Sequence, residues 1–317
     1  MGRFLLKRLA SALVTLWLLA TIVFFIVNLL PGDVGRKVLG AFATKEDVSA
    51  YNHQIGTDRP LINQYGTTLR HVFTLDFGTS YKSATSVNKI IYPALFRSGK
   101  LAILALLITV PLAIAAGVFA GRRQGRLADR AVVMTGLASS SIPEFVTAAL
   151  LVSVFCVTWK LGRVFANPPP GTSLVGQLRY LLTPAIAMAI VYFGYIARMT
   201  RAGVITALQS DYARTASMKG LSRGRVMRQH ILRNALAPTI TVISAQIGYL
   251  FGGIIGVERV FAYAGLGTTM LSAVQSKDIP VLSGAVLMVG IIYMFSTLAA
   301  DLLIAFLNPR VRLETSR

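Results

Sequence analysis

The sequence has few histidines and almost no cysteine, and each shortage argues against a class of site. The single cysteine, Cys156, excludes a disulfide within the chain and argues against a cysteine-based metal site. The three histidines, His53, His71 and His230, do not fall at the spacing of metal ligands. Gly35–Ala41 has two glycines at the separation found in phosphate-binding loops but lacks the Lys and Ser/Thr that must follow. We therefore expect neither a nickel site nor ATP hydrolysis in this chain.

Charged residues of any kind are also scarce, because 14% of the 317 residues are charged and 54% are hydrophobic. A soluble domain usually has about 25% charged residues, so this composition indicates a membrane protein. The charge is unbalanced, with 32 Lys and Arg against 12 Asp and Glu. The basic residues mostly flank apolar runs, which is typical of membrane topology, and no known nucleic-acid-binding module is recognisable. We therefore predict a lipid bilayer around the chain and no nucleic acid partner.

Six apolar runs are long enough to cross a bilayer as helices, which needs about 20 residues each. They are Leu9–Leu30, Leu101–Gly121, Ala131–Thr158, Leu181–Arg201, Leu236–Gly256 and Val281–Leu307. The first is too long for the apolar core of a secretory signal peptide, and no small-residue cleavage site follows it promptly. The expected fold is an all-α integral membrane protein with six transmembrane helices.

These runs divide the chain into three parts. Residues 1–30 hold an N-terminal tail and the first span, residues 31–100 form an extracytoplasmic segment, and residues 101–317 hold the other five spans. Basic residues concentrate after the second span and in the loop 202–235, which places that loop and both termini in the cytoplasm. In the 31–100 segment, aromatic and apolar residues at intervals predict a small cap of short helices and turns.

The third run is longer than one crossing requires and contains the sequence "SSSIPEF" at Ser139–Phe145. Pro143 removes a backbone donor and predicts a kink in the helix. Glu144 would then lie near mid-membrane, where a charge costs about 2.5–3.5 kcal/mol on insertion scales, so it should face a cavity or a partner. A hydrogen bond or a local ion pair within the kink is the alternative.

Glycines recur every four residues in two of the predicted spans. Gly117 and Gly121 lie in the second span, and Gly248, Gly252 and Gly256 lie in the fifth. Close helix packing is the ordinary interpretation of this spacing. Lining of a path, or packing against a partner subunit, is the functional alternative.

The loop between the fourth and fifth spans interrupts this apolar chain with a basic segment. Asp211–Lys219 contains no Gly or Pro and predicts a short helix that Gly220 ends. Ser222 is a suitable N-cap for a second helix, and Pro238 is expected to open the next span. One apolar face of this second helix follows 3.6-residue spacing and comprises Met227, Ile231, Leu232, Ala235 and Leu236.

The first helix of this loop is expected to present small side chains outward. Ala213, Ala216 and Ser217 would let another protein approach closely, with Arg214 and Lys219 beside them. This pattern favours docking to a protein. Two alternatives are an amphipathic helix resting on anionic lipid and a basic loop without any partner.

The segment resembles the cytoplasmic loop of ABC-importer permeases, which carries a Glu-Ala-Ala-x-x-x-Gly motif. Ala216 and Gly220 match it, whereas Arg214 and Thr215 stand where the general motif has Glu and Ala. The version "RTA…KGL…RNALAP" is similar to the peptide/nickel (dipeptide/oligopeptide) importer family, and the long outer segment resembles the first of its two paralogous permeases. Further motifs match in order at Leu29–Asp33, Asp76–Ser80, Ser141–Pro143, Val257–Gly267, Lys277–Gly284 and Leu307–Arg312.

The resemblance implies a type I ABC importer permease fold in the bacterial inner (plasma) membrane. It also implies a second homologous permease, two ABC ATPase subunits and an extracytoplasmic substrate-binding protein. ATP and Mg would be bound by the ATPases, with no cofactor in this chain. The short helix would be a coupling helix that sits in a groove of the ATPase. The residues assigned to this contact are Asp211, Tyr212, Ala213, Arg214, Thr215, Ala216, Lys219, Gly220 and Leu221.

We therefore expect a non-catalytic permease subunit of an ATP-driven importer of dipeptides or oligopeptides. Pro143 and Glu144 are predicted to border the translocation path, because a peptide carries a terminal ammonium that the carboxylate would meet. Nickel chelates, haem and glutathione are alternative cargoes within the family. A self-sufficient secondary transporter is the alternative outside it. A membrane-embedded enzyme would need clustered carboxylates or histidines at the membrane surface, and the sequence shows no such cluster.

Overall fold

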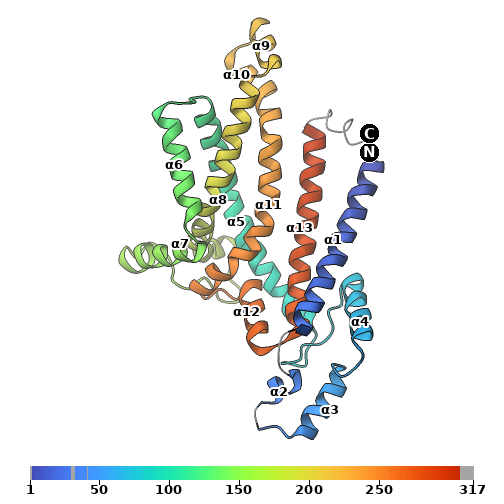
Figure 1. Ribbon diagram of the computed structural model, residues 1–317. Helices are drawn as coiled ribbons and strands as arrows, with labels where there is room; N and C mark the ends of the chain where they lie inside the picture. The colour runs from blue at the N-terminus through green and yellow to red at the C-terminus, as the bar shows by residue number, and fades with distance from the viewer. Residues whose placement is uncertain (1, 30–32, 41, 308–317) are drawn as a thin grey trace. The chain divides into compact units, whose positions relative to one another are not determined.

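The computed structural model describes residues 2–29, 33–40 and 42–307, and these residues are mostly helical (Figure 1). The helices in chain order are α1 (Gly2–Leu29), α2 (Val34–Leu39), α3 (Lys45–Ile55), α4 (Leu61–Thr74), α5 (Val87–Gly121), α6 (Leu127–Ser141), α7 (Glu144–Leu151), η1 (Val152–Thr158), α8 (Leu174–Leu208), α9 (Asp211–Met218), α10 (Arg223–Val226), η2 (Met227–Ile231), α11 (Leu232–Val260), α12 (Leu266–Ser276) and α13 (Ile279–Leu307). Within the described ranges, the only β-type pairing is one isolated bridge between Thr79 and Ser86.

The chain divides into two compact units. Unit 1 comprises Met1–Leu5, Gly99–Tyr263 and Tyr293–Arg317, and unit 2 comprises Leu6–Ser98 and Ala264–Ile292. Unit 1 therefore holds α6–α11, and unit 2 holds α2–α4 and α12.

Five helices are each long and apolar enough to cross a membrane, and a bent pair makes a sixth candidate span. The five are α1, α5, α8, α13 and the continuous run Arg223–Val260, and the pair is α6 with α7 and η1. The prediction of six apolar spans in an all-α fold is therefore confirmed, with the third span broken. Leu30, which ends the first predicted span, lies outside the described residues, as do most of the predicted motifs Leu29–Asp33 and Leu307–Arg312.

The break in the third span is sharper than the predicted kink, because α6 and α7 meet at 97° (Figure 1). Ile142 has extended backbone angles (φ −92°, ψ 126°), since a residue before proline is pushed out of the helical region. The hydroxyl groups of Ser139, Ser140 and Ser141 donate to the carbonyl oxygens of the last turns of α6. These bonds fold the serine side chains back onto α6, and a new helix follows Pro143 in place of a bend in the old one.

In unit 1, α8 packs along α11, α6 and α7. Helix backbones come very close at three glycines of this group. A Cβ added to Gly194 would lie 1.9 Å from the carbonyl oxygen of Gly136 in α6, and one added to Gly203 would lie 2.3 Å from that of Ala235 in α11. A Cβ added to Gly117 of α5 would lie 2.5 Å from the carbonyl oxygen of Ala197 in α8. Small residues allow this approach, and such packing drives helix association in membranes.

The predicted glycine packing is confirmed at four of the five positions. Gly117 and Gly121 contact α8, while Gly248 and Gly256 each lie against an aromatic side chain. The prediction is wrong for Gly252, where an added Cβ would meet no described atom within 4 Å.

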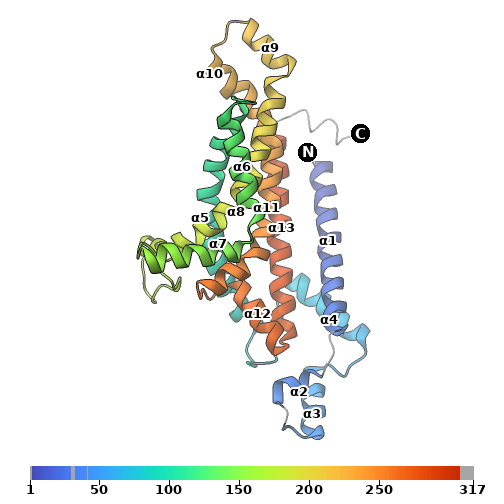
Figure 2. The same ribbon diagram turned by 60° about the vertical axis from the view of Figure 1, so that its left-hand side comes forward.

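The basic loop forms a hairpin of α9 and α10 at one end of α8 and α11 (Figure 2). We call Asp211–Val226 the α9–α10 hairpin. Ser222 precedes α10 as predicted, but its side chain makes no capping hydrogen bond. The expectation that Pro238 opens a span is wrong, because Pro238 lies inside α11. The helix begins earlier because α10 runs into α11 through the π-helical turn η2.

Unit 2 contains the short helices that were expected for the segment 31–100. Asp33 caps α2 by accepting from the Arg36 amide at 2.9 Å, and Thr44 with Asp47 forms a capping box at the start of α3. The helix α5 begins at Val87, earlier than the predicted start of the second span.

Candidate functional site

The outward face of α9 is the first candidate site. Asp211, Arg214, Thr215 and Met218 follow i, i+3, i+4, i+7 spacing, and all four are exposed. Met218 has a relative exposure of 74%. The stripe therefore combines one acid, one base, a hydroxyl group and a thioether, a mixture suited to contact with another protein.

The inward face of α9 corrects the predicted orientation of two of the three small residues, since only Ser217 is exposed as predicted. Ala213 and Ala216 are 4% and 5% exposed, so they cannot present a surface to a partner. They pack instead in a cluster of the chain's own helices, which comprises Val204, Ala207, Ala213, Ala216, Val226, Ile231 and Ala235. The small side chains thus let α9 lie close against α8 and η2, and they hold the outward face in place.

The end of α9 is a tight turn at Gly220, as predicted. Gly220 has φ +77°, in the left-handed region that glycine adopts without strain. The amides of Lys219, Gly220 and Leu221 donate to carbonyl oxygens of the last turn of α9. This arrangement satisfies the helix C-terminus in the way expected of a left-handed cap.

Glu144 is the second candidate, and it lies in the first turn of α7. Its Oε1 atom accepts from the Tyr192 hydroxyl group of α8 at 3.3 Å, and the same hydroxyl lies 3.3 Å from the carbonyl oxygen of Tyr249 in α11. A Cβ on Gly253 would lie 2.7 Å from Oε1, so the carboxylate rests against a bare stretch of α11 backbone. The half-buried carboxylate thus joins three helices of unit 1 at the break before α7. Pro143, the other residue predicted to border a path, is exposed at this break.

A buried carboxylate anchors the segment Ser80–Lys82 to the start of α13 within unit 2. Asp278 is 4% exposed and precedes α13. Its oxygens accept from the Ser80 hydroxyl group at 2.5 Å, from the Tyr81 amide at 3.1 Å and from the Lys82 amide at 3.4 Å. The sequence motifs Asp76–Ser80 and Lys277–Gly284 therefore meet in space. We call Asp278 and Ser80–Lys82 the Asp278 anchor.

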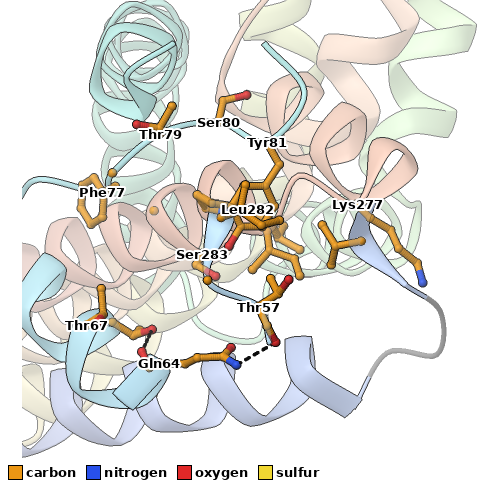
Figure 3. Close-up of a pocket in the computed structure, with 18 of the residues that line it drawn as sticks. Thr57, Gln64, Thr67, Phe77, Thr79, Ser80, Tyr81, Lys277, Leu282 and Ser283 are labelled. Atoms are coloured by element: carbon orange, nitrogen blue, oxygen red, sulfur yellow. Dashed lines mark hydrogen bonds between the residues drawn. The ribbon is translucent and has the colours of Figure 1, made fainter. Parts of the chain in front are cut away.

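A cavity of about 700 Å³ lies beside this anchor in unit 2. In Figure 3, the side chains of Gln64 and Thr67 lie at the bottom of the view and those of Ser80 and Tyr81 at the top, with Ser283 between them. Volumes between about 300 and 1,000 Å³ are usual for small-molecule sites.

Two titratable groups of the cavity wall, His71 and Tyr81, are neutral at pH 7, while Asp33, Arg59 and Lys277 also line the cavity. Burial lowers the pKa of His71 more than the charge of Asp76 raises it, so the imidazole carries no proton charge. Burial, reinforced by the charge of Asp278, raises the pKa of Tyr81 to about 12. His71 and Tyr81 therefore offer hydrogen bonds rather than charge to a molecule in the cavity. Among the described residues, no group of three His, Cys, Asp or Glu could hold a metal ion.

Comparison with known protein families identifies the family to which the chain belongs. Residues 113–313 match the family described as "Binding-protein-dependent transport system inner membrane component", and residues 1–115 match its N-terminal companion family. The chain belongs to this transport family. It is an integral, multi-pass membrane permease subunit of a bacterial ABC importer, and its fold is of the type I importer class.

Similar proteins cover the permease from end to end. The "Putative peptide transport system permease protein" of Brucella abortus (strain 2308) is 34% identical over 99% of this chain and 100% of its own length. The "Glutathione transport system permease protein GsiC" of Salmonella choleraesuis is 33% identical over 98% of this chain and 99% of its own length. A solved chain titled "Crystal structure of an amino acid ABC transporter with histidines" is 19% identical, with a TM-score of 0.49 over 70% of this chain and 94% of that one.

Some contacts in the permease join residues that no local sequence pattern connects. Tyr192, Tyr249 and Gly253 surround Glu144, but they come from helices far along the chain. Val226 completes the cluster under α9 but precedes the apolar face that was predicted. The two motifs that form the Asp278 anchor lie far apart in the chain, and no local sequence pattern indicates that they contact each other.

Proposed function

We propose that this permease carries short peptides across the membrane and is driven by ATPase subunits that dock on the outward face of α9. A homologous second permease completes the path, and an extracytoplasmic protein delivers the cargo. The chain itself binds no ATP and hydrolyses nothing, and both termini are cytoplasmic. Full-length similarity to a relative named for peptide transport supports the cargo class. Glutathione is itself a short peptide, so the second named relative fits the same class.

The observation that carries the ATPase coupling is the two-sided character of α9. Its inward face is fixed in the permease core, while Thr215 and Met218 stand exposed on the opposite face. A short helix held in this way moves with α8 and η2 as one body. A force applied to its outer face is therefore passed to the spans rather than absorbed by a flexible loop. Of the residues assigned to the ATPase contact, Ala213 and Ala216 pack against the permease core and position α9, and the exposed residues contact the ATPase.

Cysteine cross-linking tests this coupling directly. Single cysteines would be placed at Thr215, Met218 or Ala216 after the one native cysteine, the buried Cys156, is replaced by alanine. We expect Thr215→Cys and Met218→Cys to capture the ATPase subunit in membranes. Ala216→Cys is the matched control, because its side chain faces the permease core and should capture nothing. Capture from Ala216 alone, or capture of phospholipid alone, would contradict the proposal.

We also propose that Glu144 meets the terminal ammonium of the peptide on the path. Glu144→Gln keeps an oxygen that accepts from Tyr192 but removes the charge. Tyr192→Phe removes that hydrogen bond but keeps the charge. If charge recognition matters, the glutamine variant should lose about tenfold or more in peptide uptake, while the phenylalanine variant keeps most of it. The measurement is uptake of labelled dipeptide by cells at equal permease level, and the opposite ranking would indicate a purely structural carboxylate.

A further inference from the structure

The turn between α5 and α6 gathers a concentrated positive charge. Its sequence, Arg122–Arg130, contains four arginines and a single acid, Asp129. All four arginines are exposed. The turn joins a membrane-spanning helix to the first half of the broken span, so the charge lies where helices leave the apolar layer.

The one acid of this turn, Asp129, does not neutralise the four arginines, because it forms an ion pair with Arg201 of α8. Asp129 is 2% exposed and accepts from the Arg201 Nη2 atom at 2.7 Å. It also accepts from the amide of Gly125 at 2.9 Å. Gly125 itself has φ +80°, so the turn has a defined left-handed geometry. These bonds fix the turn on α8 and leave its arginines outside the pair.

Exposed apolar side chains lie directly beside these cations. The guanidinium of Arg123 lies 4.0 Å from the ring centroid of Phe119, which is 44% exposed on α5. Leu127 is 84% exposed at the first residue of α6. It borders a surface hollow whose other walls include Arg123, Arg126 and Arg130. A ligand for this surface needs an anionic group next to an apolar body.

We propose that the α5–α6 turn is a binding site for the headgroup of an anionic phospholipid. The phosphate would contact Arg123, Arg126 and Arg130, whose planar guanidinium groups suit phosphate oxygens. The acyl chains would lie along Phe119 and Leu127. An acidic protein surface would satisfy the arginines but not the exposed apolar side chains of Phe119 and Leu127 beside them. This site does not depend on the cargo or on the ATPase contact.

Lipid binding to the purified full-length chain tests the proposal. The chain in neutral detergent would be titrated with dioleoyl phosphatidylglycerol and, separately, with dioleoyl phosphatidylcholine, and bound lipid would be counted by native mass spectrometry. We expect the anionic lipid alone to be retained. Arg123→Gln with Arg126→Gln should weaken it by about fivefold per arginine, roughly 25-fold in all. Because these side chains are exposed, the thermal unfolding midpoint in detergent should not change.

Two matched variants distinguish lipid binding at this turn from attraction of the lipid to the net positive charge of the chain. Arg223→Gln with Arg225→Gln removes the same charge from exposed positions of α10 and should leave lipid binding unchanged. Leu127→Asn keeps every arginine and should weaken the binding of the anionic lipid. Equal losses in the two arginine pairs would overturn the proposal, since net charge alone would then explain binding. Inorganic phosphate that bound as tightly as the lipid would also overturn it, because the acyl chains would contribute nothing.

Discussion

Replacing Gly194 by alanine is expected to prevent α8 from packing on α6 and to remove most of the folded permease. The new methyl carbon would lie 1.9 Å from the carbonyl oxygen of Gly136. That neighbour is backbone, so no side chain can rotate away and the two helices must separate. Overpacking of this kind costs about 3 kcal/mol or more, which is a factor of roughly 100 in the folded population.

Two other glycine-to-alanine changes calibrate this prediction. Gly136→Ala meets its nearest atom at 3.2 Å, so a small shift should accommodate it at a modest cost. Gly252→Ala meets no described atom within 4 Å and should be neutral or slightly stabilising, because alanine is the better helix former. The measurement is the thermal unfolding midpoint and the yield of monodisperse protein in detergent. An unfolding midpoint for Gly194→Ala equal to that for Gly252→Ala would show that the α6–α8 contact is looser than described.

Replacing Asp278 by alanine should release the segment Ser80–Lys82 from the start of α13. The change removes three hydrogen bonds and leaves the hydroxyl group of Ser80, which is 2% exposed, without its acceptor. Buried donors left in this way cost about 1–3 kcal/mol each. We expect amide hydrogen exchange of residues 79–86 to accelerate by about 100-fold and limited proteolysis to cut there, with α8 and α11 unaffected.

Asp76→Ala is the matched control for the Asp278 anchor. Asp76 belongs to the motif Asp76–Ser80 but is exposed, and it accepts a bond from the Gly78 amide at 3.3 Å. Its loss should change the exchange rates only slightly. Asp278→Asn should fall between the two variants, because one oxygen remains for Tyr81 while the new NH₂ group faces donors. Unchanged exchange in Asp278→Ala would mean that the Asp278 anchor does not hold residues 79–86 in place.

The membrane spans were predictable because each consists of one continuous apolar run in the sequence. An apolar run of sufficient length has few alternatives to a membrane helix, and a glycine such as Gly220 ends a short helix by its own backbone preference. The π-helical turn η2 and the early start of α11 broke these rules, since Pro238 is tolerated inside the helix. Local pattern alone placed that boundary too late.

Features that depend on packing between distant elements were not predictable from the sequence. Small residues on α9 suited an outward or an inward face equally, and only the neighbouring helices decide that Ala213 and Ala216 face inward. The contact between Gly136 and Gly194 lacks the four-residue repeat that drew attention to other glycines. The 97° break at Pro143 is sharper than the predicted kink, and both α6 and α7 pack against α8, which lies farther along the chain.

The backbone contacts of α8 also restrict how the permease moves. At Gly194 and Gly203 it touches the backbones of α6 and α11, and Gly117 of α5 touches it between those two levels. Sliding or rotation of one of these helices past another would drive main-chain atoms together at several heights at once. The four helices are therefore expected to travel as a single rigid block, and the hinges of a transport cycle should be sought in the segments that leave this block.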